Sequence, residues 1–290
     1  MTVTDDNLTL HSVDVRRRFD HAADHFDDAD FVHRVTRDGL LTRIQPMSVD
    51  ASIVVDLGSA TGSAGRQLAK RFRGARVVAV DSSLRMLGKL QRKRSWFSKG
   101  AAVQGDALAL PLADASVDVI FANLLLPWID EPGAAFTEIA RVLRGDGLFA
   151  FATLGPDSLL GLRDAWRSVD SGVHVKRFAD MHDLGDALVL AGLRDPVLDV
   201  DWLSVNYRNS AALFRDITAT GARNTLQQRA RGLAGRQRFR RMTDALFGAG
   251  NDSEATLQFE LVYGHSWGCG SRGDANGVPI DARNIPLRQR

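Results

Sequence analysis

Four polar residues stand at the ends of short apolar segments, where they could together hold a small ligand. Asp56 and Asp81 end the β-branched runs "SIVVD" and "ARVVAVD", and Asp106 and Asn123 end two later segments. Because ligands of open α/β sheets bind at the carboxyl ends of the strands, we expect these side chains to meet at one edge of a sheet. There Asp81 is placed to accept hydrogen bonds from both ribose hydroxyls, and Asp106 could meet an adenine amino group. Each carboxylate could instead be a solvated strand end.

The glycine-rich loop after Asp56 narrows the choice of ligand. The segment "GSATGSAG" (58–65) fits neither the G-x-G-x-x-G pattern of nicotinamide dinucleotide sites nor the Gly-Lys-Ser/Thr of a Walker loop. A ligand with a sulfonium and an ammonium group but no phosphate suits neighbouring carboxylates. In this combination the chain resembles the class I S-adenosylmethionine-dependent methyltransferases over residues 45 to 155. We expect the cofactor to be bound by Asp56, Gly58, Ala60, Gly62, Asp81, Ser82, Met86, Asp106, Ala107, Asn123 and Leu124.

Ala60 is the unusual residue of this loop. Such loops often read D-x-G-x-G-x-G, and Ala60 replaces the middle glycine. If φ is negative at this position, the extra methyl group costs little; if φ is positive, the alanine is strained and the loop should shift. We expect cofactor binding to survive the replacement.

Hydrophobic periodicity predicts the elements that position these residues. Five apolar runs predict buried strands, and helical patterns alternate with them; the "GDG" at 145–147 predicts a turn before the fifth strand. Such alternation is typical of a parallel sheet with helices on both faces. The predicted strands are "SIVVDLG", "ARVVAVD", "AAVQGDA", "VDVIFAN" and "LFAFATL".

Further elements flank this alternating core. Helical patterns at 13–27 and 31–44 precede it, and two alternating runs, at 197–207 and 255–268, predict a hairpin on the sheet edge. The segment 209–248 between these runs looks helical and is very basic. The expected fold is therefore α/β: a Rossmann-like class I methyltransferase with a seven-stranded, mostly parallel sheet, N-terminal helices and a helical insertion before the last strand.

The expected organisation has four parts. They are an N-terminal helical cap (1–45), a core that binds S-adenosylmethionine (46–155), a C-terminal part of the sheet (156–268) with a basic lid or substrate insertion at about 207–250, and a disordered tail (269–290) rich in Gly, Asn, Asp and Arg.

Composition excludes several classes of protein. The 290 residues are 44% hydrophobic and carry a net charge of +2, so overall charge does not indicate nucleic-acid binding. The single cysteine, Cys269, excludes an internal disulfide and a multi-cysteine zinc site. His21 and His25 lack the glutamate and the third ligand of a zinc helix, so no metal is expected. Without a signal peptide or an apolar spanning run, we expect a cytoplasmic monomer that binds no membrane.

Blocks outside the cofactor motifs carry a closer resemblance. From about residue 13 to 268 the chain is similar to the malonyl-acyl-carrier-protein O-methyltransferases of biotin synthesis, the BioC family. The matching blocks are "VRRRFDHAADHFDDA" (15–29), "LGPDSLLGLRDAW" (154–166), "HVKRFADMHDLGDALVLAGLRDPVLDVD" (174–201), "ITATGARN" (217–224) and "ELVYGHSWG" (260–268). This family implies methylation of the free carboxylate of malonyl-carrier protein. The chain departs from the family at Ala60, and at Phe26, a lid position where the family has tyrosine.

Several arginines are candidates for contacts with substrate and carrier. A carboxylate nucleophile needs placement and desolvation rather than a general base, and arginine offers it a bidentate fork. Arg177 is the first candidate, with Arg163, Arg215 and Arg223 as weaker ones. Between 223 and 241 there are seven arginines and no acidic residue, which fits a dock for an acidic carrier protein, a solvated helical face or RNA. These arginines are Arg223, Arg229, Arg231, Arg236, Arg238, Arg240 and Arg241.

Other functions remain compatible with the sequence. One is a small-molecule or quinone methyltransferase of the same fold, because fold alone does not specify the substrate. Another is a non-methylating relative, either an arginine-hydroxylating assembly factor or a binding scaffold, which Ala60 and Phe26 keep open. The basic insertion and the block at 174–201 favour the carrier-linked substrate and disfavour nucleic acid.

Overall fold

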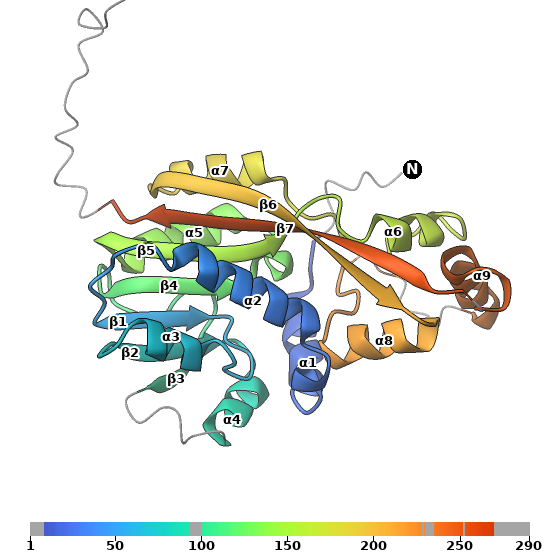
Figure 1. Cartoon of the computed structure of the whole chain (residues 1–290), viewed down its shortest axis with the longest axis horizontal. Helices are drawn as coiled ribbons and strands as arrows, with labels where there is room; N and C mark the ends of the chain where they lie inside the picture. The colour runs from blue at the N-terminus through green and yellow to red at the C-terminus, as the bar shows by residue number, and fades with distance from the viewer. Residues whose placement is uncertain (1–8, 93–99, 228, 230–234, 252, 270–290) are drawn as a thin grey trace, which may run out of the picture.

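The computed structural model describes residues 9–92, 100–227, 229, 235–251 and 253–269. A seven-stranded sheet with the order β3-β2-β1-β4-β5-β7-β6 forms its centre (Figure 1). Strands β1 to β5 run parallel, and β7 pairs antiparallel with β5 and β6. The strands are β1 (Ile53–Leu57), β2 (Arg76–Asp81), β3 (Ala101–Gln104), β4 (Val117–Asn123), β5 (Leu143–Leu154), β6 (Arg194–Tyr207) and β7 (Ala255–Trp267). The predicted mostly parallel sheet with a late hairpin at its edge is confirmed.

Helices cover both faces of the sheet because its central strands are apolar on both sides. Neighbouring residues of β4 belong to opposite cores: Phe121 packs with α2 (Phe31–Ile44) and α3 (Gly65–Arg71), whereas Ile120 packs with α5 (Pro132–Val142) and α7 (Met181–Leu190). Alternate side chains of a strand point to opposite faces, so a continuous apolar run requires a helical layer on each side.

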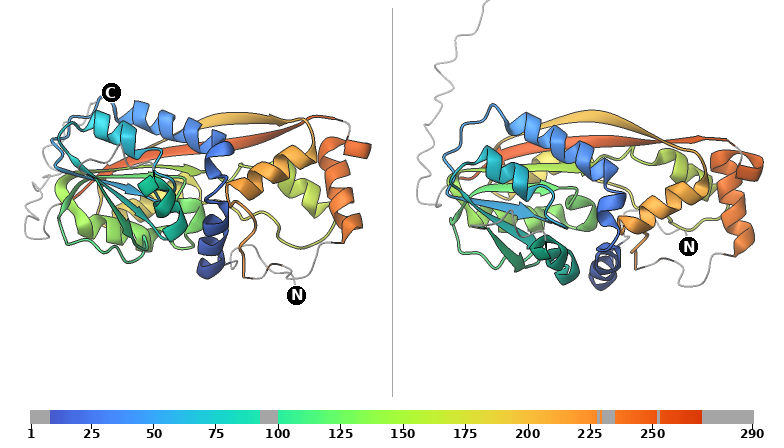
Figure 2. Two further views of the ribbon diagram at one scale, coloured as in Figure 1. Left: turned by 90° about the horizontal axis from the view of Figure 1, so that it is seen from below. Right: turned by 60° about the horizontal axis from the view of Figure 1, so that its bottom comes forward.

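The remaining helices lie around the edges of this sandwich. The N-terminal α1 (Ser12–Ala22) and the 3₁₀ turn η2 (Phe26–Asp28) lie beside α4 (Leu84–Arg92) (Figure 2). Strands β6 and β7 extend beyond the parallel strands, and α6 (Leu160–Arg167), α8 (Ser210–Ala219) and α9 (Arg236–Phe247) gather at their far end. Two short 3₁₀ turns complete the elements, η4 (Leu126–Trp128) and η5 (Ala249–Asn251). Within the described part of the chain, every helix is too short or too polar to span a bilayer.

Three local predictions were wrong. The "GDG" segment lies inside β5 rather than in a turn, because the register against β4 shifts there and the extra residues form an irregularity within the strand. The helix predicted at 13–27 ends at Ala22. Among its described residues, the segment 209–248 is helical only in α8 and α9: Gly221, at φ +75°, follows α8, and Leu226 bridges to Leu10 instead. The tail at 270–290 lies outside the described residues.

Candidate functional site

The sheet brings the predicted polar residues to one edge. Asp56 lies in β1, Asp81 ends β2 and Asn123 ends β4, and β1 is hydrogen-bonded to both other strands. Asp106 follows β3, the outer neighbour of β2. Parallel strands place their carboxyl ends at the same edge of the sheet. The residues at and after the ends of these strands therefore contribute to a single site.

The loop from Gly58 to Gly62 is held tightly under this edge. Both glycines have positive φ, +72° and +80°. A Cβ added at Gly62 would come within 2.6 Å of Leu90 Cδ1, so glycine is required there by space as well as by conformation. Ala60 also has positive φ, +47°, which is the strained case for a residue with a side chain. Its N–H nevertheless donates to Asp81 Oδ2 over 2.8 Å, so the loop stays against β2.

Ala60 and Phe26, the two positions that depart from the family motif, lie in one apolar cluster. Phe26 is 4% exposed and packs with Ala22, Ala23 and Met86, and Ala60 packs against the same group. The extra methyl group therefore lies in an apolar environment formed by the N-terminal segment. Phe26 and Ala60 are far apart in the sequence, so their contact can be seen only in the folded chain.

Three aspartates hold the N-terminal segment against α4 and the cofactor loop. Asp20 Oδ1 accepts from Ser83 Oγ over 2.6 Å. Asp24 pairs with Arg85 at 2.8 Å and Lys89 at 2.5 Å, and Asp27 accepts a hydrogen bond from Thr61 Oγ1. Sequence reasoning missed these residues, although their spacing of four and three residues is the signal of one helical face.

A small cavity of about 40 Å³ lies between the loop and this cover. Four polar atoms of residues that line it are buried without a hydrogen-bond partner among the described residues: His33 Nδ1, Asp56 Oδ2, Ser59 Oγ and Asn123 Oδ1. Unpaired buried polar atoms are costly and call for a partner. Their carboxylate and amide oxygens suit a ligand with an ammonium donor, so the residues fit the ammonium group of S-adenosylmethionine. The space holds only a few water molecules and is lined by no residue of β2 or of the loop after β3, so it is only part of the expected cofactor site.

The electrostatics of this cavity are set by burial. Burial raises the pKa of Asp56 to about 7, and the neighbouring Asp81 carboxylate adds to this shift. Burial, together with the charge of Arg37, lowers the pKa of His33 to about 4, so the imidazole is neutral near pH 7. Asn123 Nδ2 donates to the His33 carbonyl over 2.9 Å and ties α2 to β4. The sequence gives no indication of His33 or Arg37, because α2 precedes every cofactor motif.

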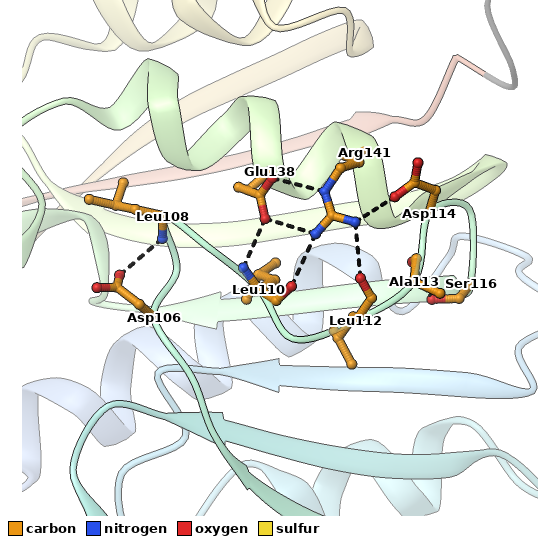
Figure 3. Close-up of polar contacts among 9 residues, drawn as sticks. All are labelled: Asp106, Leu108, Leu110, Leu112, Ala113, Asp114, Ser116, Glu138 and Arg141. Carbon is orange, nitrogen blue, oxygen red and sulfur yellow. Dashed lines mark hydrogen bonds and ion pairs between the residues drawn. The ribbon is translucent and has the colours of Figure 1, made fainter.

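Arg141 shapes the loop that carries the predicted adenine contacts. From α5, its guanidinium makes two 2.8 Å hydrogen bonds to Glu138 and bonds of 3.0 Å to the carbonyls of Leu110 and Leu112 (Figure 3). It also pairs with Asp114 over 2.5 Å. These partners hold residues 110–114, a few residues after Asp106 and Ala107, against α5.

The other predicted cofactor residues vary in exposure. Asp106 is exposed, and its Oδ1 accepts from Leu108 N over 3.0 Å. Ser82 is exposed as well, whereas Ala107 and Met86 are buried. Leu124 follows β4 with φ +54°, so the backbone turns sharply after Asn123.

The predicted substrate arginines do not converge on this cavity. Arg163 is 6% exposed, and its guanidinium donates to the carbonyls of Pro156, Ser158 and Lys176, which makes it a structural residue rather than an anion ligand. Arg177 is exposed between α6 and α7. Arg223 Nε donates to Thr218 Oγ1 over 3.0 Å. Arg215 lines a separate cleft beside α8.

The predicted basic surface is smaller than the sequence indicates. Four of its arginines are exposed on α9: Arg236, Arg238, Arg240 and Arg241. Arg229 does not belong to it, because its guanidinium pairs with Asp14 of α1 and donates to the Leu226 carbonyl. Arg231 lies outside the described residues.

Comparisons with known proteins agree with this geometry. Residues 55–151 match the family model described as a methyltransferase domain. The malonyl-[acyl-carrier protein] O-methyltransferase of Gallionella capsiferriformans is 36% identical over 94% of this chain and 97% of its own length. That of Halorhodospira halophila is 39% identical over 95% and 96%. Among solved structures, the YcgJ protein of Bacillus subtilis superposes with a TM-score of 0.56 at 16% identity, covering 81% of this chain and 98% of that one.

Proposed function

Since this chain belongs to the malonyl-[acyl-carrier protein] O-methyltransferase family, we propose that it methylates the free carboxylate of a malonyl thioester on an acyl-carrier protein, an early step of biotin synthesis. The observation that carries the proposal is the cavity at the carboxyl ends of β1 and β4, with its four unpaired buried polar atoms. The match to relatives along almost their whole length supports the substrate.

Different residues at this sheet edge bind different parts of the cofactor. S-adenosylmethionine supplies an electrophilic methyl group when it is bound. Asp81 accepts hydrogen bonds from the ribose hydroxyls. The loop after β3, with Asp106 and Ala107, binds the adenine. Asp56 and Asn123 provide acceptors for the ammonium group. Phe26 covers the loop and excludes water from the reacting atoms.

The chemistry asks little of the protein beyond placement. The malonyl carboxylate is already an anionic nucleophile, so the chain needs to orient and desolvate it rather than remove a proton. Phe19 and Trp128, whose rings meet edge to face at 5.1 Å, provide apolar walls near the N-terminal cover. Arg177 provides the cation for the carboxylate.

The function is tested by incubating the purified protein with methyl-labelled S-adenosylmethionine and malonyl-carrier protein, and analysing the product by mass spectrometry. The expected product is the methyl ester, formed with malonyl-carrier protein but not with acetyl-carrier protein, which lacks the free carboxylate. A folded protein that binds the cofactor but transfers no methyl group would instead be a non-methylating relative.

Arg177→Ala is expected to lower kcat/KM for malonyl-carrier protein roughly 10- to 100-fold, because a charge-assisted hydrogen bond to the carboxylate is lost. Arg177→Lys keeps the charge but not the fork, so its activity should be intermediate. Steady-state kinetics at saturating cofactor measure both variants. Wild-type kcat/KM in Arg177→Ala would remove Arg177 from the substrate site.

Helix α9 is proposed as the dock for the acidic carrier protein. Reversing two charges on one of its faces, Arg236→Glu with Arg240→Glu, should lower kcat/KM for malonyl-carrier protein about tenfold at low salt, because complementary charge accelerates association. The deficit should shrink at high salt, and turnover of malonyl-coenzyme A should be unchanged. Arg73→Glu, an exposed charge reversal before β2, is the control. An equal deficit at every salt concentration would contradict the dock.

A further inference from the structure

A second cleft, of about 360 Å³, lies between the start of α2, the end of β6 and α8. Figure 1 shows these three elements next to one another. Ala29, Phe31 and Val32 line one wall, and Ala212 and Arg215 line the wall on α8. This cleft is nine times the volume of the cavity at the cofactor loop, about 360 against 40 Å³, and no cofactor motif contributes to it.

The charges of the cleft favour an anion. Arg208 and Arg215 both line it, and neither has a hydrogen bond or an ion pair within 4.0 Å among the residues described by the structure. Asp216 is the one acidic residue in the lining, which leaves a net charge of +1 (two arginines minus one aspartate). Burial raises the pKa of Asp216, and the neighbouring Arg215 charge acts in the opposite direction.

The rest of the lining suits a ligand with amide groups and an apolar middle. Val32, Val205 and Ala212 provide apolar surface. Asn209 Oδ1 caps α8 by accepting from Ala212 N over 2.9 Å, and Asn206 Oδ1 accepts from Thr256 Oγ1 over 2.7 Å. Both side-chain oxygens are engaged, so the groups that these two asparagines offer a ligand are their NH₂ donors.

The cleft lies between the proposed dock and the methyl-transfer site. On α8, Ala212, Arg215 and Asp216 face the cleft, while Phe214 meets Phe239 of the arginine-bearing α9 with ring centroids 4.9 Å apart. At the opposite wall, the segment before and within α2 separates the two cavities: Phe31 and Val32 line the cleft, and Asp30 and His33 line the cofactor cavity.

We propose that this cleft binds the phosphopantetheine arm that carries the malonyl thioester, with Arg208 and Arg215 pairing with its phosphate. The arm has the three features that the lining offers partners for: a phosphate, amide groups and an apolar section between them. A carrier protein docked on α9 would place the phosphate at α8 and direct the thioester toward the start of α2. This assignment rests on the proposed function, because it takes the carrier-linked substrate as given.

The test compares binding of two synthetic ligands, malonyl-4′-phosphopantetheine and malonyl-pantetheine, to the full chain saturated with S-adenosylhomocysteine, by isothermal titration calorimetry. The wild-type protein should bind the phosphorylated ligand about tenfold more tightly or better, as a charge-assisted phosphate contact requires. In Arg208→Ala and in Arg215→Ala the preference should fall to less than about threefold, with affinity for malonyl-pantetheine unchanged. Arg73→Ala, a distant exposed arginine, should keep the full preference.

Three outcomes would overturn the proposal. They are equal affinity of the wild-type protein for the two ligands, no measurable binding of either, and equal losses for both ligands in the arginine variants, which would assign these arginines to the malonyl carboxylate or to the fold. Methyl transfer to malonyl-carrier protein is measured separately on the same preparations. If methyl transfer occurs but the two ligands bind equally, the cleft assignment is rejected and the proposed function is kept. If the phosphorylated ligand is preferred but no methyl group is transferred, the proposed function is rejected.

Discussion

Replacing Asp81 by alanine is expected to abolish cofactor binding at ordinary concentrations, with a loss of affinity of at least about 100-fold. Two charge-assisted hydrogen bonds to the ribose hydroxyls disappear together, each contributing about 1.5–3 kcal/mol. The carboxylate also accepts from Ala60 N and from Ser83 N, both over 2.8 Å. Its removal therefore releases the loop that carries Ala60 as well as the ligand.

Thermal unfolding with and without S-adenosylhomocysteine measures this loss. At about 100 times its Kd a ligand stabilises the wild-type protein by about 2.7 kcal/mol, which raises the unfolding midpoint by roughly 5–10 °C in a chain of this size. Asp81→Ala should show no shift at the same concentration. Asp146→Ala removes a fully exposed carboxylate at the start of β5 and should shift as the wild type does. A normal shift in Asp81→Ala would place the ribose elsewhere.

Asp56→Asn is expected to change the pH dependence of stability strongly. The pKa of Asp56 is raised from 3.8 to about 7 in the folded chain. Between these values the folded state binds more protons than the unfolded state, so the free energy of unfolding falls as pH rises from about 4 to 7 and then levels off. A difference of about 3 pKa units corresponds to about 4 kcal/mol at most. Because asparagine does not ionise, the variant should not show this fall in the free energy of unfolding.

Urea unfolding of the ligand-free wild type and of Asp56→Asn at pH 5.5 and pH 8 tests this expectation. His33 works in the opposite direction: its folded pKa of about 4 lies below that of an unfolded histidine, so its contribution rises with pH between about 4 and 6.5. It is common to both proteins and cancels in the comparison. The variant should gain stability relative to the wild type at both pH values, and by about 2 kcal/mol more at pH 8 than at pH 5.5. Parallel changes in both proteins would mean that Asp56 titrates normally.

The fold and the cofactor side of the site were open to prediction because their signals are local. Asp56, Asp81 and Asn123 each lie at or near the end of an apolar run whose residue types already favour a buried strand, and a parallel sheet gathers such ends without further information. The late hairpin was predictable for the same reason, since β6 and β7 each show their own alternation. The predicted turn at 145–147 failed because a register shift within β5 depends on its partner strand.

The sequence by itself therefore determined the class of fold, the strand ends that meet at the candidate site and, through its resemblance, the family. Only the tertiary structure decided the remainder of the site: the positive φ of Ala60, its contact with Phe26, the aspartates that fasten α1, and the cleft beside α8. Arg229 belongs to this second group, since its partner Asp14 is 215 residues away. These features depend on distances between segments far apart along the chain, and residue type and spacing encode such distances only through the packing of the whole molecule.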